Sequence, residues 1–324
     1  MRLASIDIGT NSAKLLISKS APGNTLTPLE EQQRTIRLGE GVDANGVLSE
    51  AAVERLIAAL QEFQVIAGAW EVEQYIVVGT SASRDAGKTL SHTVRERTGL
   101  HYEILSGEEE ADLSFTGAIA GLPRAIGNLV TCDIGGGSTE IVRGTFQGVV
   151  HECLSLNIGS VRITERFFSC QPPKPSELEA AKRFTRKLFA DSIAPQQDNY
   201  SLVGTSDTHR LLLDLHHALV SGEIQITTGP LRAQWERLRK TGEHARKLTL
   251  PQVRGWVENL VQMEESDVLA LNPGKLRGRS DVFPAACLIC FELMHRLAQE
   301  SITISKWGLR HGIGVKVLKD GTLR

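Results

Sequence analysis

Two copies of one short pattern carry the residues of this chain that are best suited to bind phosphate. Asp7 to Ser12 and Asp133 to Ser138 each begin with an aspartate at the end of an apolar run and continue into glycine, serine and threonine. Glycine permits tight curvature, so such a turn can aim several backbone N–H groups at one anion. The aspartate can hold a hard cation or one of its waters. The repetition predicts two like-folded halves that face each other across a phosphate-binding cleft.

The backbone of each turn is expected to cradle one of two neighbouring phosphate groups. The expected contacts are Gly9, Thr10, Asn11 and Ser12 in the first turn, and Gly135, Gly136, Gly137 and Ser138 in the second. We expect Asp7 and Asp133 to act on the metal side, through water, because Mg²⁺ releases its hydration shell reluctantly. Glu140 follows the second turn, and two interpretations stay open: it supports the metal or the water, or it is an ordinary exposed strand residue.

Strand-like and helix-like segments alternate around both turns, which predicts an α/β fold. Apolar runs predict strands at residues 3–8, 13–18 and 32–38 in the first half, and at 129–134 in the second. The pattern Ser176 to Glu179 is typical of a capping box, where a serine accepts a hydrogen bond at the start of a helix. A further apolar helix is expected over residues 209–220, whereas residues 221–250 show no clear periodicity.

Length and composition limit the class of protein. A chain of 324 residues suggests about two domains, and its net charge of −2 provides no global basic field for a nucleic acid. No segment resembles a signal peptide, and no apolar run is long enough to span a bilayer, so we expect a cytoplasmic protein. The five cysteines fit reduced thiols. Cys287 and Cys290 lie in an apolar run, so packing is expected of them rather than metal binding.

Four ordered stretches resemble the exopolyphosphatase and guanosine pentaphosphate phosphohydrolase (Ppx/GppA) family. They are Asp7 to Ser12, Thr80 to Ala86, Ser106 to Ala111, and Asp133 to Glu140. Weaker similarity continues through residues 204–208, 279–281 and 308–312 and spans nearly the whole chain. The resemblance implies the actin, sugar-kinase and heat-shock-70 superfamily, with two ribonuclease-H-like (actin-like ATPase) domains facing each other across a cleft.

The resemblance also implies where the two domains lie along the chain. Domain I is expected over residues 1–124 and is completed by a C-terminal helix at residues 309–324. Domain II is expected over residues 125–308. Longer members of the family carry an additional helical domain at the C-terminus, so this chain resembles the short, two-domain form.

The catalytic assignments follow from the same resemblance. Glu110 matches the carboxylate that activates the attacking water in the family, and Glu109 is the alternative. Arg84 matches an arginine that contacts phosphate, as a planar guanidinium does well. The alternatives are that residues 108–110 only favour the positive end of a helix, and that Arg84 forms a surface ion pair with Asp85.

Basic residues outside the turns are candidate contacts for the distal part of an anionic chain. They are Arg37, Lys275, Arg277, Arg279 and Arg310. Two departures from the family pattern bear on substrate choice. Asp207 stands where the family has glycine and places a negative charge where anions are normally bound, and His311 stands where the family has glutamate.

The interpretation that we favour from the sequence is a Mg²⁺-dependent exopolyphosphatase that releases terminal phosphate from inorganic polyphosphate. The alternative is a hydrolase of guanosine pentaphosphate, because the same active-site residues could act on either substrate. A sensor that binds without turnover and an ATP-dependent kinase of the superfamily are less favoured. Neither a nucleic acid nor a membrane is expected as a partner, no organic cofactor is expected, and a homodimer is left open.

Overall fold

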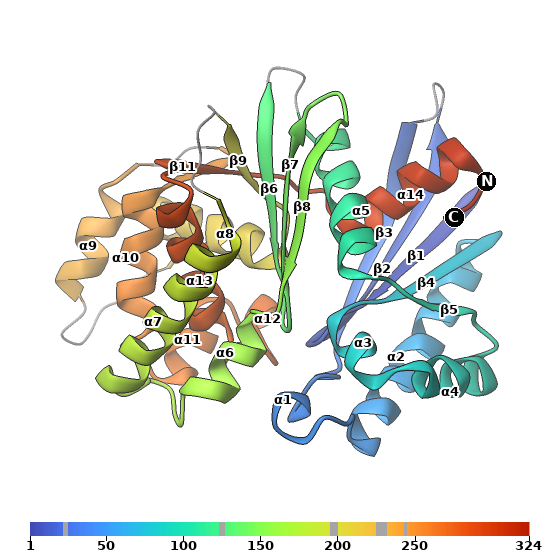
Figure 1. The fold of residues 1–324 in the computed structure, drawn as a ribbon, viewed down its shortest axis with the longest axis horizontal. Helices are drawn as coiled ribbons and strands as arrows, with labels where there is room; N and C mark the ends of the chain where they lie inside the picture. The colour runs from blue at the N-terminus through green and yellow to red at the C-terminus, as the bar shows by residue number, and fades with distance from the viewer. Residues whose placement is uncertain (22–24, 123–126, 195–199, 225–231, 243–244, 324) are drawn as a thin grey trace.

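The fold is an α/β arrangement built on two mixed β-sheets, as expected from the sequence (Figure 1). It is described here from a computed structural model, which covers all residues except 22–24, 123–126, 195–199, 225–231, 243–244 and 324. The expected boundary between residues 124 and 125 lies outside the described residues, and the two domain ranges stay a prediction. The two sheets are consistent with two actin-like domains.

The first sheet has five strands in the order β3-β2-β1-β4-β5. Its strands are β1 (Arg2–Ile8), β2 (Ser12–Ala21), β3 (Thr25–Thr35), β4 (Gln74–Gly79) and β5 (Tyr102–Ile104). β1, β2 and β3 form an antiparallel meander, and β4 and β5 continue from β1 in parallel. The first of the two repeated turns therefore joins β1 to β2, at the end of the central strand.

The second sheet repeats this plan and adds one strand at its edge, in the order β10-β11-β9-β6-β7-β8. Its strands are β6 (Asn128–Ile134), β7 (Thr139–Thr145), β8 (Val150–Leu156), β9 (Ser201–Gly204), β10 (Lys247–Thr249) and β11 (Ser301–Ile304). β6, β7 and β8 are again antiparallel, β9 and β11 continue in parallel, and β10 is antiparallel. The second turn joins β6 to β7, so both turns occupy equivalent positions.

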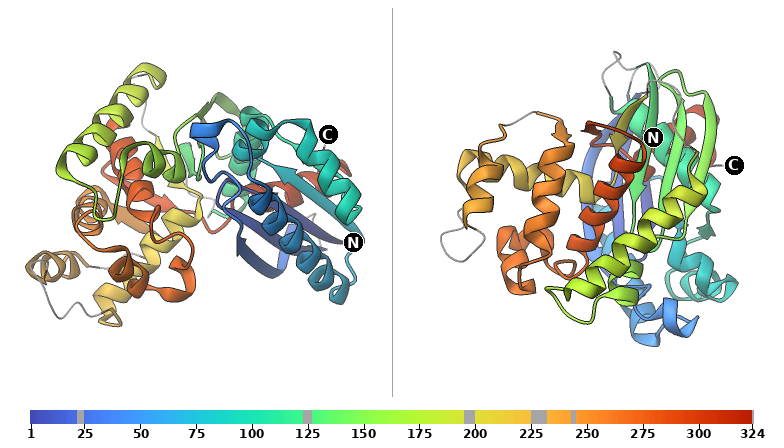
Figure 2. Two further views of the ribbon diagram at one scale, coloured as in Figure 1. Left: turned by 90° about the horizontal axis from the view of Figure 1, so that it is seen from below. Right: turned by 60° about the vertical axis from the view of Figure 1, so that its left-hand side comes forward.

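Helices cover the two sheets separately. Those beside the first sheet are α1 (Val42–Asn45), α2 (Glu50–Ala69), α3 (Ser81–Ala86) and α4 (Lys88–Thr98). Those beside the second are α6 (Ser160–Phe167), α7 (Pro175–Ser192), α8 (Asp207–Ser221), α9 (Arg232–Arg239), α10 (Leu250–Leu260), α11 (Glu265–Leu271), α12 (Pro273–Leu276) and α13 (Phe283–Arg296). Figure 2 shows this second group gathered on one side of the molecule. Cys287 and Cys290 are buried in α13, in agreement with a packing role.

Two further helices form the layer that lies between the sheets. α5 (Gly107–Ala120) packs against β7 and β8, and α14 (Leu309–Asp320) packs against β1, β2 and β3. The two helices also pack against each other (Figure 1). Each helix covers one sheet with an apolar face, since Phe115 joins the cluster on the second sheet and Ile313 joins the cluster on the first.

The contact between α5 and α14 is made by backbone, because glycine occupies the crossing on both helices. A Cβ atom on Gly312 would lie 1.7 Å from the carbonyl oxygen of Leu113, and one on Gly117 would lie 2.1 Å from that of Gly308. No side chain fits at such distances. The small residues therefore set the separation of the two halves of the molecule.

Several element boundaries differ from those that the sequence predicts. β3 spans Thr25–Thr35 rather than residues 32–38, and it begins earlier because Thr25 to Glu31 pair with β2. It ends at Thr35 because the next two N–H groups, of Ile36 and Arg37, donate to the carbonyl of Asn11 at 3.0 and 2.9 Å. α7 begins at Pro175, whose fixed φ suits the first helical position, so Ser176 lies inside the first turn. α8 begins at Asp207, two residues before the expected start, since Ser206 caps it.

The helices of the described residues include none that is both long enough and apolar enough to cross a membrane.

The close contact of α5 and α14 at their glycines leads to the first testable prediction. Gly312→Ala should lower the free energy of unfolding by about 1–3 kcal/mol or more, because the new methyl group forces α14 away from α5. Gly68→Ala is the matched control, since this exposed glycine of α2 has nothing within 4 Å of the added Cβ. The control should be neutral or stabilising by up to about 1 kcal/mol. Equal effects of the two substitutions in urea unfolding would contradict the assignment.

Candidate active site

The two turns have the same internal geometry. The N–H of Gly9 donates to the carbonyl of Ser12 at 3.0 Å, and the N–H of Gly135 donates to that of Ser138 at 2.9 Å. Both bonds close a tight loop at the end of an antiparallel hairpin. A turn of this shape can direct its remaining N–H groups at one anion, which is the role that the sequence predicts for both turns.

The tips of the two turns meet across the space between the sheets. A Cβ atom on Gly136 would lie 2.9 Å from Cβ of Thr10, and one on Gly137 would lie 2.6 Å from Oγ of Ser81. Glycine is therefore required in the second turn because the first turn and the start of α3 approach so closely. The repeated motifs, separated by more than a hundred residues, form one site.

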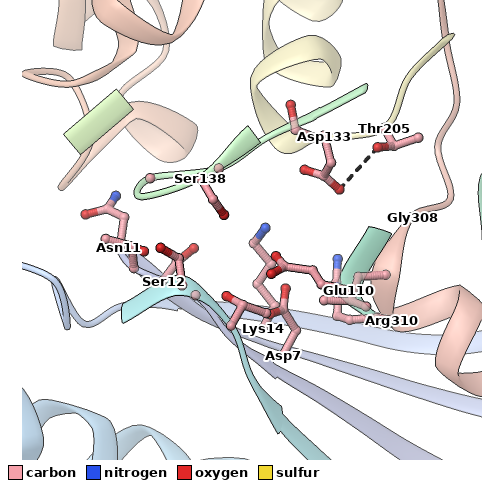
Figure 3. Close-up of a pocket in the computed structure, with 18 of the residues that line it drawn as sticks. Asp7, Asn11, Ser12, Lys14, Glu110, Asp133, Ser138, Thr205, Gly308 and Arg310 are labelled. Carbon is pink, nitrogen blue, oxygen red and sulfur yellow. Dashed lines mark hydrogen bonds between the residues drawn. The ribbon is translucent and has the colours of Figure 1, made fainter. Parts of the chain in front are cut away.

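A cavity of about 90 Å³ lies between the turns, and we call it the central hollow. Figure 3 shows Asp7, Asn11 and Ser12 on one side of it, with Asp133 and Thr205 on the other. All eight expected phosphate contacts line it, together with Lys14, Thr80, Ser81, Glu110, Ser206, Arg210, Gly308, Leu309, Arg310 and His311. The structure thus brings both halves of the predicted site into one polar cavity.

Asp7 and Asp133 both face the central hollow from the ends of their strands. Burial raises the pKa of each carboxyl group, and the charge of Lys14 partly offsets this. Asp133 also contributes to the raised pKa of Asp7, so the two carboxylates interact through space. Thr205 donates a hydrogen bond to Asp133 at 3.1 Å. Two buried carboxylates that repel each other are a suitable environment for a bound cation.

The residue that faces the aspartate is positively charged in the first hairpin and acidic in the second. Strand register sets Asp7 opposite Lys14 in the first hairpin and Asp133 opposite Glu140 in the second. Glu140 is buried and accepts a hydrogen bond from Ser155 at 2.9 Å, so it is not the exposed strand residue that was one of the two interpretations. Burial, and then the charge of Asp133, raise the pKa of Glu140 to about 7.

Glu110 lies in the first turn of α5 and lines the central hollow. Burial raises its pKa well above the usual value, and the nearby charge of Glu140 raises it further. Arg84 opposes this shift, since its Nη1 lies 2.8 Å from Oε2 of Glu110. The same guanidinium reaches Ser138 of the second turn at 3.5 Å. Glu110 is therefore a basic carboxylate held at the junction of the two halves.

Glu109 occupies a different environment from its neighbour. Its carboxylate accepts a hydrogen bond from the N–H of Ser106 at 2.8 Å, while Ser106 accepts one from the N–H of Glu109 at 3.1 Å. This reciprocal pair is a capping box at the start of α5. Glu109 is exposed, whereas Glu110 is buried in the central hollow. The geometry favours Glu110 over Glu109 as the group that meets a substrate.

The five candidate distal contacts lie in different places. Arg310 lines the central hollow itself, where it donates to the carbonyl of Leu15 at 2.8 Å. Arg37 pairs with Asp281 at 3.1 Å, across the two halves. The remaining three line a separate and larger cavity beside α8 and α12: Lys275, Arg277 and Arg279.

The two departures from the family pattern are both compensated locally. Burial opposes ionisation of Asp207, but Lys14 and Arg210 hold its pKa well below the usual range. Lys14 lies 2.8 Å from Asp207 in an ion pair, and Arg210 forms a second. Burial lowers the pKa of His311 to about 3, so this imidazole is neutral and stacks on Trp307. Neither residue leaves an uncompensated negative charge in the cavity.

Sequence reasoning missed Lys14 and Arg210, which both line the central hollow. Lys14 could have been found, because alternation along a strand places it on the same face as Ser12. Arg210 lies one helical turn beyond Ser206, on an element whose first residues were expected to be a loop. Its contact with the site depends on the packing of α8, which a local pattern does not specify.

The described residues include no group of three or more histidine, cysteine, aspartate or glutamate side chains arranged to hold a metal ion by themselves. Mg²⁺ commonly uses one or two carboxylates and completes its shell with water and substrate phosphate. Asp7 and Asp133 fit that pattern, because both are buried, raised in pKa and beside a polar cavity.

The chain is similar to known proteins over nearly its whole length. The model of the Ppx/GppA phosphatase family matches residues 16–320. Exopolyphosphatase 2 of Mycobacterium tuberculosis is 29% identical over 332 residues, which cover 98% of each chain. Exopolyphosphatase 1 of Mycobacterium leprae is 28% identical over 330 residues, which cover 99% of this chain and 92% of the relative.

Solved structures have the same architecture. The Ppx/GppA enzyme of Aquifex aeolicus matches with a TM-score of 0.73 at 27% identity, over 98% of this chain and 99% of that one. An exopolyphosphatase from Cytophaga hutchinsonii matches with a TM-score of 0.83 at 24% identity, over 99% of both chains. The second likeness supports the fold alone.

The raised pKa of Glu140 predicts how the stability of the metal-free protein depends on pH. The folded protein keeps this proton up to about pH 7, whereas the unfolded chain releases it near the ordinary value of 4.5. The folded state should therefore lose stability as the pH rises through this window, by up to about 1.4 kcal/mol per pH unit. Glu140→Gln cannot ionise and should reduce this slope in urea unfolding with a chelator present. Identical slopes for both proteins would exclude Glu140 as the source.

Proposed function

This chain belongs to the Ppx/GppA phosphatase family, and on that premise we propose that it is a Mg²⁺-dependent exopolyphosphatase. It would release terminal orthophosphate from inorganic polyphosphate. The observation that carries the proposal is the position of Glu110, a buried carboxylate of raised pKa that faces two glycine-rich turns in one small cavity. A phosphoanhydride hydrolase needs both features, a group to position water and donors for phosphoryl oxygens.

The electrostatics of the central hollow suit a metal-bound polyanion. Asp7 and Asp133 would hold Mg²⁺, in part through water. When bound, the ion would neutralise charge on the phosphoryl oxygens and so stabilise the transition state. Lys14 and Arg310 add positive charge from the first half of the molecule, and Arg210 adds it from the second. The site therefore combines cations with backbone N–H donors around a space of phosphate size.

The attack on phosphorus would be carried out by water that Glu110 orients. Glu110 would take the proton from this water as the new P–O bond forms and the anhydride P–O bond breaks. The leaving group is the polyphosphate chain shortened by one unit. A carboxylate with a raised pKa is a stronger base than an ordinary glutamate, so burial prepares Glu110 for this step. Arg84 would keep Glu110 oriented and partly offset the rise of its pKa.

Inorganic polyphosphate is favoured over guanosine pentaphosphate by the surroundings of the site. The larger cavity next to it is lined mainly by charged and polar residues, with two glycines and Leu211, and none of the described residues lining it is aromatic. Such a surface suits a repeating anion better than a base, which typically stacks on aromatic rings. The names of two relatives as exopolyphosphatases point in the same direction.

Substitution of the proposed base tests the reaction. Glu110→Gln should reduce phosphate release from polyphosphate with Mg²⁺ by about 10²–10⁴-fold, the usual contribution of one positioned base. Glu109→Gln is the matched control, because glutamine also serves at this capping-box position. The control should retain activity close to that of the wild type. Release is measured as orthophosphate from long-chain polyphosphate, guanosine pentaphosphate and ATP in parallel.

Each alternative has a distinct outcome in the same assay. Faster release from guanosine pentaphosphate would keep the mechanism and overturn the substrate. Equal loss in the two glutamine variants would overturn the role of Glu110. Tight binding of polyphosphate without any release by the wild-type protein would overturn the proposal in favour of a sensor.

A further inference from the structure

One carboxylate and two cations form a half-buried ion-pair cluster at the edge of the central hollow. Asp207 pairs with Lys14 at 2.8 Å and also with Arg210. Its side chain is 17% exposed, and those of Lys14 and Arg210 are 20% and 22% exposed. Lys14 belongs to the first sheet and Arg210 to α8, so the cluster joins the two halves. Because these three side chains are largely shielded from water, their ion pairs are stronger than a pair on the exposed surface.

The cluster lies where three cavities meet. Lys14 lines the central hollow and a side cavity of about 80 Å³. Arg210 lines the central hollow and the larger cavity of about 560 Å³, which we call the outer hollow. Asp207 itself lines both the side cavity and the outer hollow. The carboxylate of Asp207 therefore lies between the central hollow and the outer hollow.

The outer hollow has the character of an anion-binding surface. Five basic residues line it, Arg34, Arg210, Lys275, Arg277 and Arg279, against two acidic ones, Asp207 and Asp214. Arg277 is exposed and has no ion-pair partner among the described residues. The central hollow is too small for more than a short stretch of a phosphate chain, whereas the outer hollow falls in the size range of ligand pockets.

We propose that Asp207 is a specificity-determining residue that occupies, as a built-in anion, the place of a phosphate between the central and the outer hollow. A long polyphosphate whose end is in the central hollow would reach the outer hollow by taking over Lys14 and Arg210 from this carboxylate. The proposal rests on the proposed function, because it assigns the further path of the same substrate. Asp207 would weaken the binding of long chains, since each must displace it.

Charge removal at Asp207 tests this inference. Asp207→Asn frees Lys14 and Arg210, so KM for long-chain polyphosphate should fall by roughly tenfold, the size expected for one charge-assisted contact. The fall for tripolyphosphate should be clearly smaller, because this substrate does not extend into the outer hollow. The stabilisation of the protein by each polyphosphate, measured as a Tm shift with Mg²⁺, should show the same order.

Asp191→Asn is the matched control, because it removes one acidic charge from a surface ion pair on α7 that lines none of the three cavities. Asp191 pairs with Lys187 at 2.6 Å and its side chain is 60% exposed, so the substitution should change KM for long chains by no more than about threefold. An equal gain in both variants would overturn the proposal, since net charge alone would then explain it. An equal gain for tripolyphosphate and long chains in Asp207→Asn would overturn the path into the outer hollow.

The Tm measurement needs no turnover, so it separates this inference from the proposed function. If the wild-type protein released no phosphate but Asp207→Asn still gained the larger Tm shift with long chains, only the hydrolase assignment would fail. Because Asp207→Asn leaves two cations unpaired, its folding must be checked by thermal unfolding. Asp207→Glu keeps the charge and provides a second test. Tighter binding of long chains by Asp207→Glu than by wild type would overturn the proposal.

Discussion

The backbone contact between α5 and α14 is the constraint on which the rest of the molecule depends. Gly117 and Gly312 let the two helices approach until a Cβ atom would overlap with the facing carbonyl. α5 packs on the second sheet and α14 on the first, so this crossing fixes how the sheets face each other. Glu110 and Arg310 lie in the first turns of these helices. This close crossing therefore places a candidate base and a cation in the same small cavity.

Charge within the central hollow is balanced across the two halves. The two hairpins are alike in backbone but differ in the residue opposite each aspartate, lysine in the first and glutamate in the second. Lys14 partly offsets the raised pKa of both Asp7 and Asp133, whereas the charge of Asp133 raises the pKa of Glu140. The duplicated fold thus yields two hairpins that are not equivalent, since the second has Glu140, a buried carboxyl group of raised pKa, where the first has Lys14.

Local patterns in the sequence predict much of the fold. The features that they do not predict depend on contacts between distant segments or on a single residue. The two turns and the central strands depend on neighbouring residues, so residue types and periodicity identify them. β3 and α7 were predicted with shifted boundaries, because the end of β3 is set by a carbonyl of Asn11 far back in the chain and the start of α7 by a proline. Arg210 was missed for a similar reason, since α8 brings it to the site only through tertiary packing.

The sequence by itself determined the repeated Asp-Gly turns and, through its resemblance to a family, Glu110 as the candidate base. It could not distinguish the environments of Glu109 and Glu110, because adjacent helical residues differ in burial only once the helix is packed. Nor could it show that the charge of Asp207 is neutralised, since Lys14 lies almost two hundred residues away. Turn chemistry is local and can be inferred from residue types. Burial, ion pairing and pKa arise from contacts between distant segments, and only the tertiary structure decided them.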